Sequence, residues 1–107
     1  MVEILKDKNL GGWFVGNFEP SLIKRDDIEV GIKNIKANTQ PDFHYHKLKT
    51  EYTILLEGQI ICIKKNIVVE PGTIIKLYPY EKNDQFFPVD SRILILNTPS
   101  IKGDKYI

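Results

Sequence analysis

The sequence predicts a single all-β domain, built either as a sandwich or as a barrel. Short segments rich in Val, Ile, Leu and aromatic residues recur along the chain, and Gly, Pro or Asn separates them at intervals of about eight to twelve residues. No segment carries apolar residues at the spacing of an amphipathic helix. The 107 residues are 42% hydrophobic and 27% charged, which is ordinary for one globular domain.

The first part of the chain, residues 1–27, is expected to form an N-terminal arm and edge strands. Residues 13–18 are an aromatic run that predicts a short strand, and Pro20 ends it. Apolar and polar residues then alternate from Ile28 to Lys33, which is the pattern of a half-buried strand. The apolar members of this alternation are expected to face the core.

The most apolar strands follow in the second half of the chain. Asn66, which tolerates a positive φ, and the Pro71-Gly72 pair mark turns between them. The continuous apolar run at residues 54–56 implies a strand that is covered on both faces. In so small a protein the second cover is expected to be another subunit, so we expect a homodimer. The predicted strands span residues 13–18, 28–36, 43–46, 51–56, 59–64, 67–69, 73–78, 84–87 and 91–97.

Charge and cysteine content exclude several classes of protein. The formal net charge is +1 and the basic side chains are scattered among acidic ones, so we expect no binding to nucleic acid or to a membrane surface. The single cysteine, Cys62, lies in an apolar run and is expected to be a buried hydrophobe rather than half of a disulfide. The chain shows no signal-peptide pattern and no apolar run near the roughly 18 residues of a membrane span, which predicts a cytoplasmic location.

Residues 44–58 contain the candidate site. His44 and His46 lie one residue apart in a segment expected to be extended, so their imidazoles project from one face and converge. Glu51 joins them only if residues 47–50 form a turn or bulge, because simple alternation would place it on the opposite face. Two imidazoles and a carboxylate are a ligand set that divalent iron, manganese, nickel or zinc accepts. We therefore expect these three side chains to bind a metal ion.

The spacing of these residues resembles the first motif of the cupin family. That motif has two histidines separated by one residue, then three or four residues, a glutamate, six residues and a glycine, a pattern matched by His44, His46, Glu51 and Gly58. The leading glycine of the motif falls at Asn38, a residue type that also tolerates turns. The resemblance implies a cupin-type double-stranded β-helix, which is a jelly-roll barrel.

The resemblance also implies how the chain is divided. It covers residues 28–97, which are expected to form the barrel. The arm and edge strands of residues 1–27 precede it, and a polar C-terminal tail, residues 98–107, follows it. All three parts are expected to belong to one structural domain.

The second cupin motif matches less well, which affects the identity of a fourth ligand. In the family it runs glycine, five residues, proline, one residue, glycine, two residues, histidine. Here six residues separate Gly72 from Pro79, and no histidine follows the first motif. The histidine position falls at Asp84, or at Asn83 if the extra residue is absorbed differently, with Gln85 as a weaker alternative. An aspartate there would complete a set of two imidazoles and two carboxylates, which favours manganese or ferrous iron over zinc.

The resemblance implies three alternative functions. In the first, a metal-dependent enzyme of the isomerase, lyase or dioxygenase type acts on a small polar or carbohydrate-like substrate. In the second, His44 and His46 act as general acid and base. Together with Lys47 they would form the His-x-His-Lys pattern of metal-independent cupins that isomerise or epimerise nucleotide-linked keto sugars. In the third, the domain binds a small ligand or a metal and catalyses nothing.

Overall fold

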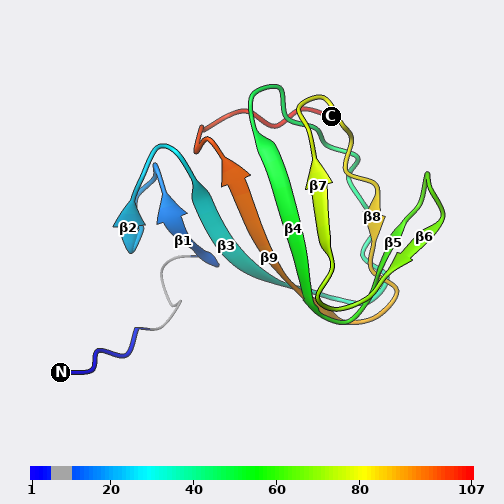
Figure 1. Ribbon diagram of the computed structural model, residues 1–107, viewed down its shortest axis with the longest axis horizontal. Helices are drawn as coiled ribbons and strands as arrows, with labels where there is room; N and C mark the ends of the chain where they lie inside the picture. Colours follow the sequence, from blue (N-terminus) through cyan, green and yellow to red (C-terminus); the bar gives the residue numbers. More distant parts are fainter. Residues whose placement is uncertain (6–10) are drawn as a thin grey trace.

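The computed structural model describes residues 1–5 and 11–107, and that part of the chain contains strands and no helix, hence none that could cross a membrane. The strands form two sheets (Figure 1). The large sheet has the order β2-β1-β3-β9-β4-β7, and the small sheet has the order β6-β5-β8. The predicted all-β class is therefore confirmed. The strands are β1 (Trp13–Gly16), β2 (Ile23–Lys24), β3 (Glu29–Ile35), β4 (Thr50–Glu57), β5 (Ile60–Cys62), β6 (Ile67–Val69), β7 (Ile74–Leu77), β8 (Gln85–Phe86) and β9 (Ser91–Thr98).

One predicted strand, at residues 43–46, is wrong. Within it only Tyr45 pairs, in an isolated antiparallel bridge with Tyr106. The carbonyl of His44 instead accepts a hydrogen bond from the backbone N–H of Asn83 at 2.8 Å. One two-bond bridge to the tail and separate hydrogen bonds from the loop before β8 therefore hold this segment, where a strand would have a continuous ladder.

The N-terminal region contributes the edge of the large sheet. Residues 1–5 lie in no strand and extend away from the sheets (Figure 1). The part of the predicted arm and edge strands that falls on residues 6–10 lies outside the described residues. The short strand β2 runs parallel to β1, with Val15 opposite Ile23, and forms the edge of the sheet.

The hydrophobic core lies between the two sheets. Leu55 of β4 and Ile60 of β5 are fully buried, and they cluster with Ile93 and Ile95 of β9 and with Phe87 after β8. Alternate residues of β4 and of β9 are buried, as expected for strands with one face on the core. Both sheets thus contribute side chains to one apolar cluster.

The face of strand β3 that points to the interior is the opposite of the predicted one. Glu29 and Gly31 are buried, whereas the apolar Val30 and Ile32 lie half-buried on the outer face. Glu29 lies directly opposite Asn97 in the ladder between β3 and β9. The interior at this end of the sheet is polar, and burial of a carboxylate is tolerated where it is paired and hydrogen-bonded. The apolar members of the alternation are therefore left on the outside.

A polar row crosses the inner face of the large sheet at this end. Glu29 and Glu51 each lie directly opposite Asn97, on the two strands that flank β9. Directly opposed residues of neighbouring strands share a face, so all three side chains project into the interior. The row places Glu51 beside residues 44–49, which lead into β4.

Candidate metal centre

Three side chains of the predicted site meet at one point. The ligand atoms of His44, His46 and Glu51 all lie within 4.8 Å of one another. Glu51 Oε1 is 3.4 Å from His46 Nε2 and 3.8 Å from His44 Nε2. The two imidazole rings are 5.1 Å apart between centroids and meet edge to face at 69°. The predicted convergence of the three side chains is present in the structure.

The outer nitrogen of each imidazole is held by an oxygen of the protein. His44 Nδ1 is 2.5 Å from Asp42 Oδ1, and His46 Nδ1 hydrogen-bonds the backbone carbonyl of Asp104. A carboxylate and a carbonyl only accept, so each Nδ1 carries a proton, and in the neutral imidazole the lone pair on Nε2 is then directed at the cluster. Metal-binding histidines are commonly oriented in this way by a carboxylate or carbonyl oxygen.

The chain reverses between His46 and Glu51 by wrapping around one carboxylate. Asp104, which is only 3% exposed, accepts hydrogen bonds from the backbone N–H groups of Lys47, Leu48 and Lys49 at 3.0, 2.9 and 2.9 Å. These bonds bend the backbone just before β4, so that Glu51 faces the two imidazoles despite the odd spacing.

The sequence alone did not identify Asp104 as part of the site. It was placed in a polar tail, and its only distinguishing feature is the Gly103-Asp104 pair. In the structure the tail runs back along the end of the sheet at which β4 begins (Figure 1). Tyr106 exchanges two backbone hydrogen bonds of 2.9 Å with Tyr45, which anchors the tail to the histidine segment.

The cluster keeps its carboxylate ionised. Burial acts to raise the pKa of Glu51, but hydrogen bonds and charge from His44 and His46 outweigh it and lower that pKa to about 2. The neighbouring Glu51 carboxylate raises the pKa of His44, against the opposing effect of burial. Burial likewise opposes the lowering of the pKa of Asp42, which results from hydrogen bonds with His44 and Lys105. A buried anion thus stands between two imidazoles at neutral pH.

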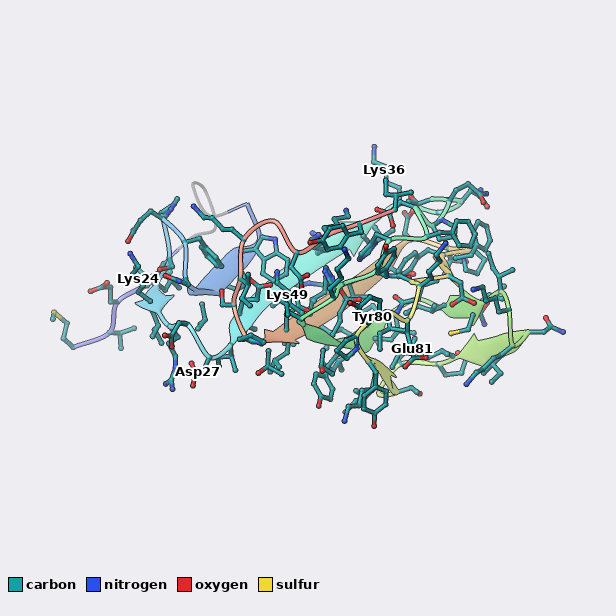
Figure 2. All side chains as sticks on the ribbon, turned by 90° about the horizontal axis from the view of Figure 1, so that it is seen from above. Lys24, Asp27, Lys36, Lys49, Tyr80 and Glu81 are labelled. Carbon is teal, nitrogen blue, oxygen red and sulfur yellow. The ribbon has the colours of Figure 1, made fainter. Side chains whose placement is uncertain are left out.

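The cluster opens into a cavity of about 310 Å³ that both sheets line. Ile93, Ile95 and Phe87 supply apolar wall, and Lys49 supplies a buried cation. Lys49 Nζ is 2.6 Å from Glu29 Oε1, so the ammonium is neutralised within the wall. Figure 2 shows Lys49 lying among the strands, whereas Lys36 projects away from the molecule.

The fourth predicted ligand lies elsewhere. Asp84 Oδ2 accepts a hydrogen bond of 2.7 Å from the backbone N–H of Lys64, and its side chain borders a different hollow together with Cys62. Its two neighbours, Asn83 and Gln85, do line the cavity of the cluster. Successive residues of an extended segment point in opposite directions, so a residue on the cavity side is flanked by residues that face away. The structure therefore does not bring Asp84 to His44, His46 and Glu51, and it places the two alternatives to Asp84 on the cavity side.

The three donors fit a divalent metal ion. Nitrogen, nitrogen and carboxylate oxygen suit first-row metals from manganese to zinc, and ligand atoms bound at about 2.1 Å to one ion lie little more than 3 Å apart. The distances of 3.4 and 3.8 Å from Glu51 Oε1 to the two Nε2 atoms are close to that separation. Three protein ligands that leave further positions open are typical of catalytic rather than structural metal sites.

No protein-family model matches the sequence, and no curated protein sequence does. Several solved structures share the fold. The lyase DddQ of Ruegeria pomeroyi, which acts on DMSP, has a TM-score of 0.71 at 13% identity, over 96% of this chain and 55% of that one. Ectoine synthase of P. lautus has a TM-score of 0.61 at 20% identity, over 75% of this chain and 64% of that one. A cupin-2 domain protein of Shewanella frigidimarina has a TM-score of 0.57 at 19% identity, over 70% and 72% of the two chains.

These similarities define the architecture and leave the reaction open. The matched region spans less than two thirds of both enzymes, and all three identities are below 25%. A shared fold does not by itself determine an activity. The two facing sheets and the matches to cupin structures agree with the fold implied by the first motif. The chain has the cupin-type double-stranded β-helix fold.

Proposed function

We propose that this protein binds one divalent metal ion through His44, His46 and Glu51 and works as a metal-dependent enzyme on a small polar or carbohydrate-like substrate. The observation that carries the proposal is the arrangement of the two imidazoles. Each has its Nδ1 engaged by an oxygen outside the cluster and its Nε2 beside Glu51 Oε1. The donor set is compatible with manganese, iron, nickel or zinc.

The residues around the cluster have separate tasks in this proposal. A bound divalent ion would supply a Lewis acid that polarises a substrate oxygen. Asp42 and the backbone of Asp104 hold the imidazoles in orientation, and the apolar wall around Ile93 and Ile95 limits access of water. Fold similarity to a lyase and a synthase supports an enzymatic role but does not choose among isomerase, lyase and dioxygenase chemistry.

Metal binding by purified protein tests the proposal. The metal-free protein should take up one equivalent of at least one of Mn²⁺, Fe²⁺, Ni²⁺ or Zn²⁺, measured by elemental analysis after gel filtration. Glu51→Gln and His44→Ala should weaken binding by at least about a hundredfold, since each removes a ligand. Asp84→Asn is the matched control and should bind as the wild type does, because that carboxylate faces away from the cluster. Failure to take up any of the four ions, or unchanged binding in Glu51→Gln, would overturn the metal function.

One observation favours a second candidate function without a metal. Asp42 and His44 form a close carboxylate–imidazole pair, and such a pair can serve as a general base beside a carbonyl. Lys47, however, lies over the ring of Tyr106 at 4.2 Å and does not line the cavity, so it does not support the His-x-His-Lys assignment. Turnover of nucleotide-linked keto sugars in the presence of a chelator would favour this function. Ligand binding without any turnover would favour the non-catalytic alternative.

The outer face of the large sheet supports the proposal of a homodimer. Val30, Ile32, Leu94 and Leu96 lie half-buried on that face, and Ile74 of β7 is 59% exposed. Apolar residues gathered on one open sheet face are typical of an interface. Sedimentation equilibrium should give twice the mass of the chain, and Ile74→Lys should shift the protein toward the monomer. A monomeric wild type at micromolar concentration would contradict the proposal.

A further inference from the structure

The cavity beside the cluster carries two buried amide groups that the protein leaves incompletely paired. In the described part of the chain, two buried side-chain atoms lack a hydrogen-bond partner, namely Asn97 Oδ1 and Gln85 Nε2. Both side chains are 3% exposed, and both line the cavity that contains Glu51. Unpaired buried polar groups are few in folded proteins and cost free energy, so two such atoms in one cavity indicate a ligand that satisfies them.

The Asn97 amide has an orientation that its surroundings dictate. Its Nδ2 donates to Glu29 Oε1 at 2.9 Å, and because a carboxylate only accepts, the amide oxygen has to point elsewhere. Glu29 is already supplied with donors, since Lys49 Nζ also reaches Oε1 and Ser100 Oγ reaches Oε2 at 3.0 Å. The Glu29 carboxylate thus has its donors, whereas Asn97 Oδ1 remains an acceptor without a donor. It lies in the row beside Glu51, where a ligand hydroxyl or amine would be its complement.

Gln85 approaches the same cavity from the small sheet. Its backbone N–H donates a hydrogen bond of 2.9 Å to Asn83 Oδ1, which fixes the start of β8. Its side-chain Nε2, in contrast, has no hydrogen-bond acceptor. This N–H group is complementary to a carbonyl or carboxylate oxygen. The two sheets thus offer one acceptor and one donor to a molecule held between them.

The charges around the cavity favour an anion once a metal is bound. Among the described residues, four carboxylates and three ammonium groups line the cavity, so a divalent ion changes their summed formal charge from −1 to +1 with both imidazoles neutral. The volume of about 310 Å³ is at the small end of the range for ligand sites, which suits a small molecule. The charged lining residues are Glu29, Asp42, Glu51, Asp104, Lys33, Lys49 and Lys105.

We propose that Asn97 and Gln85 form a recognition pair for a small hydroxy-carboxylate, with Asn97 Oδ1 accepting from its hydroxyl and Gln85 Nε2 donating to its carboxylate. This inference rests on the proposed metal function, because the bound ion supplies the positive charge. It goes beyond that function by naming the chemical class of the substrate and two residues that select it. Neither residue belongs to the proposed ligand set of His44, His46 and Glu51.

Calorimetric titration with three closely related probes tests the pair. Lactate carries both groups, propionate lacks the hydroxyl, and lactamide lacks the negative charge. Mn²⁺-loaded wild-type protein should bind lactate at least about tenfold more tightly than either of the others, because a site built to bond a hydroxyl discriminates against its absence. Equal affinity for the three, or binding of none of them by Mn²⁺-loaded protein, would overturn the inference.

Two variants separate the two roles. Asn97→Ala should lower the affinity for lactate about tenfold and leave that for propionate unchanged, so that the ratio between them approaches one. Gln85→Met keeps the length of the side chain and removes the donor, so it should weaken lactate and propionate alike. It should also leave the unfolding midpoint equal to or above that of the wild type, because an apolar group replaces an unpaired donor. The same change outside the cavity, Gln59→Met, is the control and should not alter the affinity for any probe.

The design distinguishes failure of this inference from failure of the metal function. Mn²⁺ binding should be unchanged in Asn97→Ala and Gln85→Met. If the wild type binds Mn²⁺ but Asn97→Ala retains the preference for lactate and Gln85→Met binds lactate as tightly as the wild type does, the recognition pair is refuted and the metal function stands. If no Mn²⁺ binds, the titrations are repeated on the metal-free protein. A preference for lactate that Asn97→Ala removes would then support the pair, and equal binding would refute it.

Discussion

Asp104 is predicted to hold the histidine segment and the tail together, and its substitution is the sharpest test of how the site is built. The carboxylate accepts three backbone hydrogen bonds of 2.9 to 3.0 Å while 3% exposed. Burial acts to raise the pKa of Asp104, but these backbone hydrogen bonds outweigh it and lower that pKa. Removal of the carboxylate leaves three N–H groups unpaired and frees the residue whose carbonyl orients His46.

The expected size of the effect follows from these bonds. A hydrogen bond to an ionised group contributes about 1.5–3 kcal/mol, and three bonds to one carboxylate are not independent. We therefore expect Asp104→Ala to lower the free energy of unfolding by about 3–5 kcal/mol, a large part of the stability of a domain of this size. Because the orientation of His46 depends on the same anchor, the affinity for metal should fall about 10- to 100-fold.

Urea unfolding and a chelator competition assay measure the two effects separately. Asp104→Asn, which keeps one acceptor oxygen, should give intermediate losses and remain folded for the affinity measurement. Asp90→Ala is the matched control, since the exposed Asp90 accepts one backbone hydrogen bond, from Ala37. Its substitution should cost less than about 1 kcal/mol and leave metal affinity unchanged. The reasoning is refuted if Asp104→Ala is as stable as the wild type or binds metal as tightly as Asp90→Ala does.

Two further predictions concern the scaffold, and urea unfolding tests both. Gly58 and Gly72 share a φ of 93°, but a Cβ at Gly58 would overlap the hydroxyl of Ser91, whereas a Cβ at Gly72 meets nothing within 4 Å. Gly72→Ala should lower the free energy of unfolding by about 1–2 kcal/mol from backbone strain alone. Gly58→Ala should lower it by at least about 2 kcal/mol more, because of the overlap with Ser91. Equal losses in the two variants would show that the overlap is relieved without cost. Leu55, fully buried, and Leu56, 39% exposed, are adjacent on β4. Leu55→Ala should destabilise by about 2–5 kcal/mol and Leu56→Ala by less than about 1 kcal/mol, so similar losses would contradict the assignment of the inner face.

Much of the fold was predictable because the main signals are local. Strands β4 and β9 are long and strongly apolar, and turn residues such as Asn66 and Gly72 separate the shorter strands. Asn66 and Gly72 do adopt positive φ values, of 51° and 93°. The first motif also predicted which three side chains converge, since its spacing already implies a reversal between His46 and Glu51.

The inner face of β3 was not predictable from its own residues. The local alternation selects the more apolar face as the core face, and on that rule Val30 and Ile32 should point inward. The opposite face is buried because Glu29 meets Lys49 and Ser100, which lie 20 and 71 residues away in the sequence. Only the assembled sheet shows that a carboxylate at this position has its partners.

The placement of Asp84 away from the cluster has a related reason. Alignment to the second motif pointed to Asp84, but a shift of one residue along an extended segment exchanges the cavity side for the outside. The structure turns Asn83 and Gln85 toward the cavity and Asp84 toward Lys64. Because the chain has one residue more than the motif between Gly72 and Pro79, spacing alone did not decide this register.

The sequence by itself determined the all-β class, the turns and the set of His44, His46 and Glu51, because these depend on residue type and short-range spacing. The tertiary structure alone decided that Asp104 bends the chain between His46 and Glu51. It also decided that Asn97 stands beside the site with an unused acceptor. The physical reason is that a buried polar group is tolerated only where its partners are, and those partners come from distant parts of the chain that folding brings together.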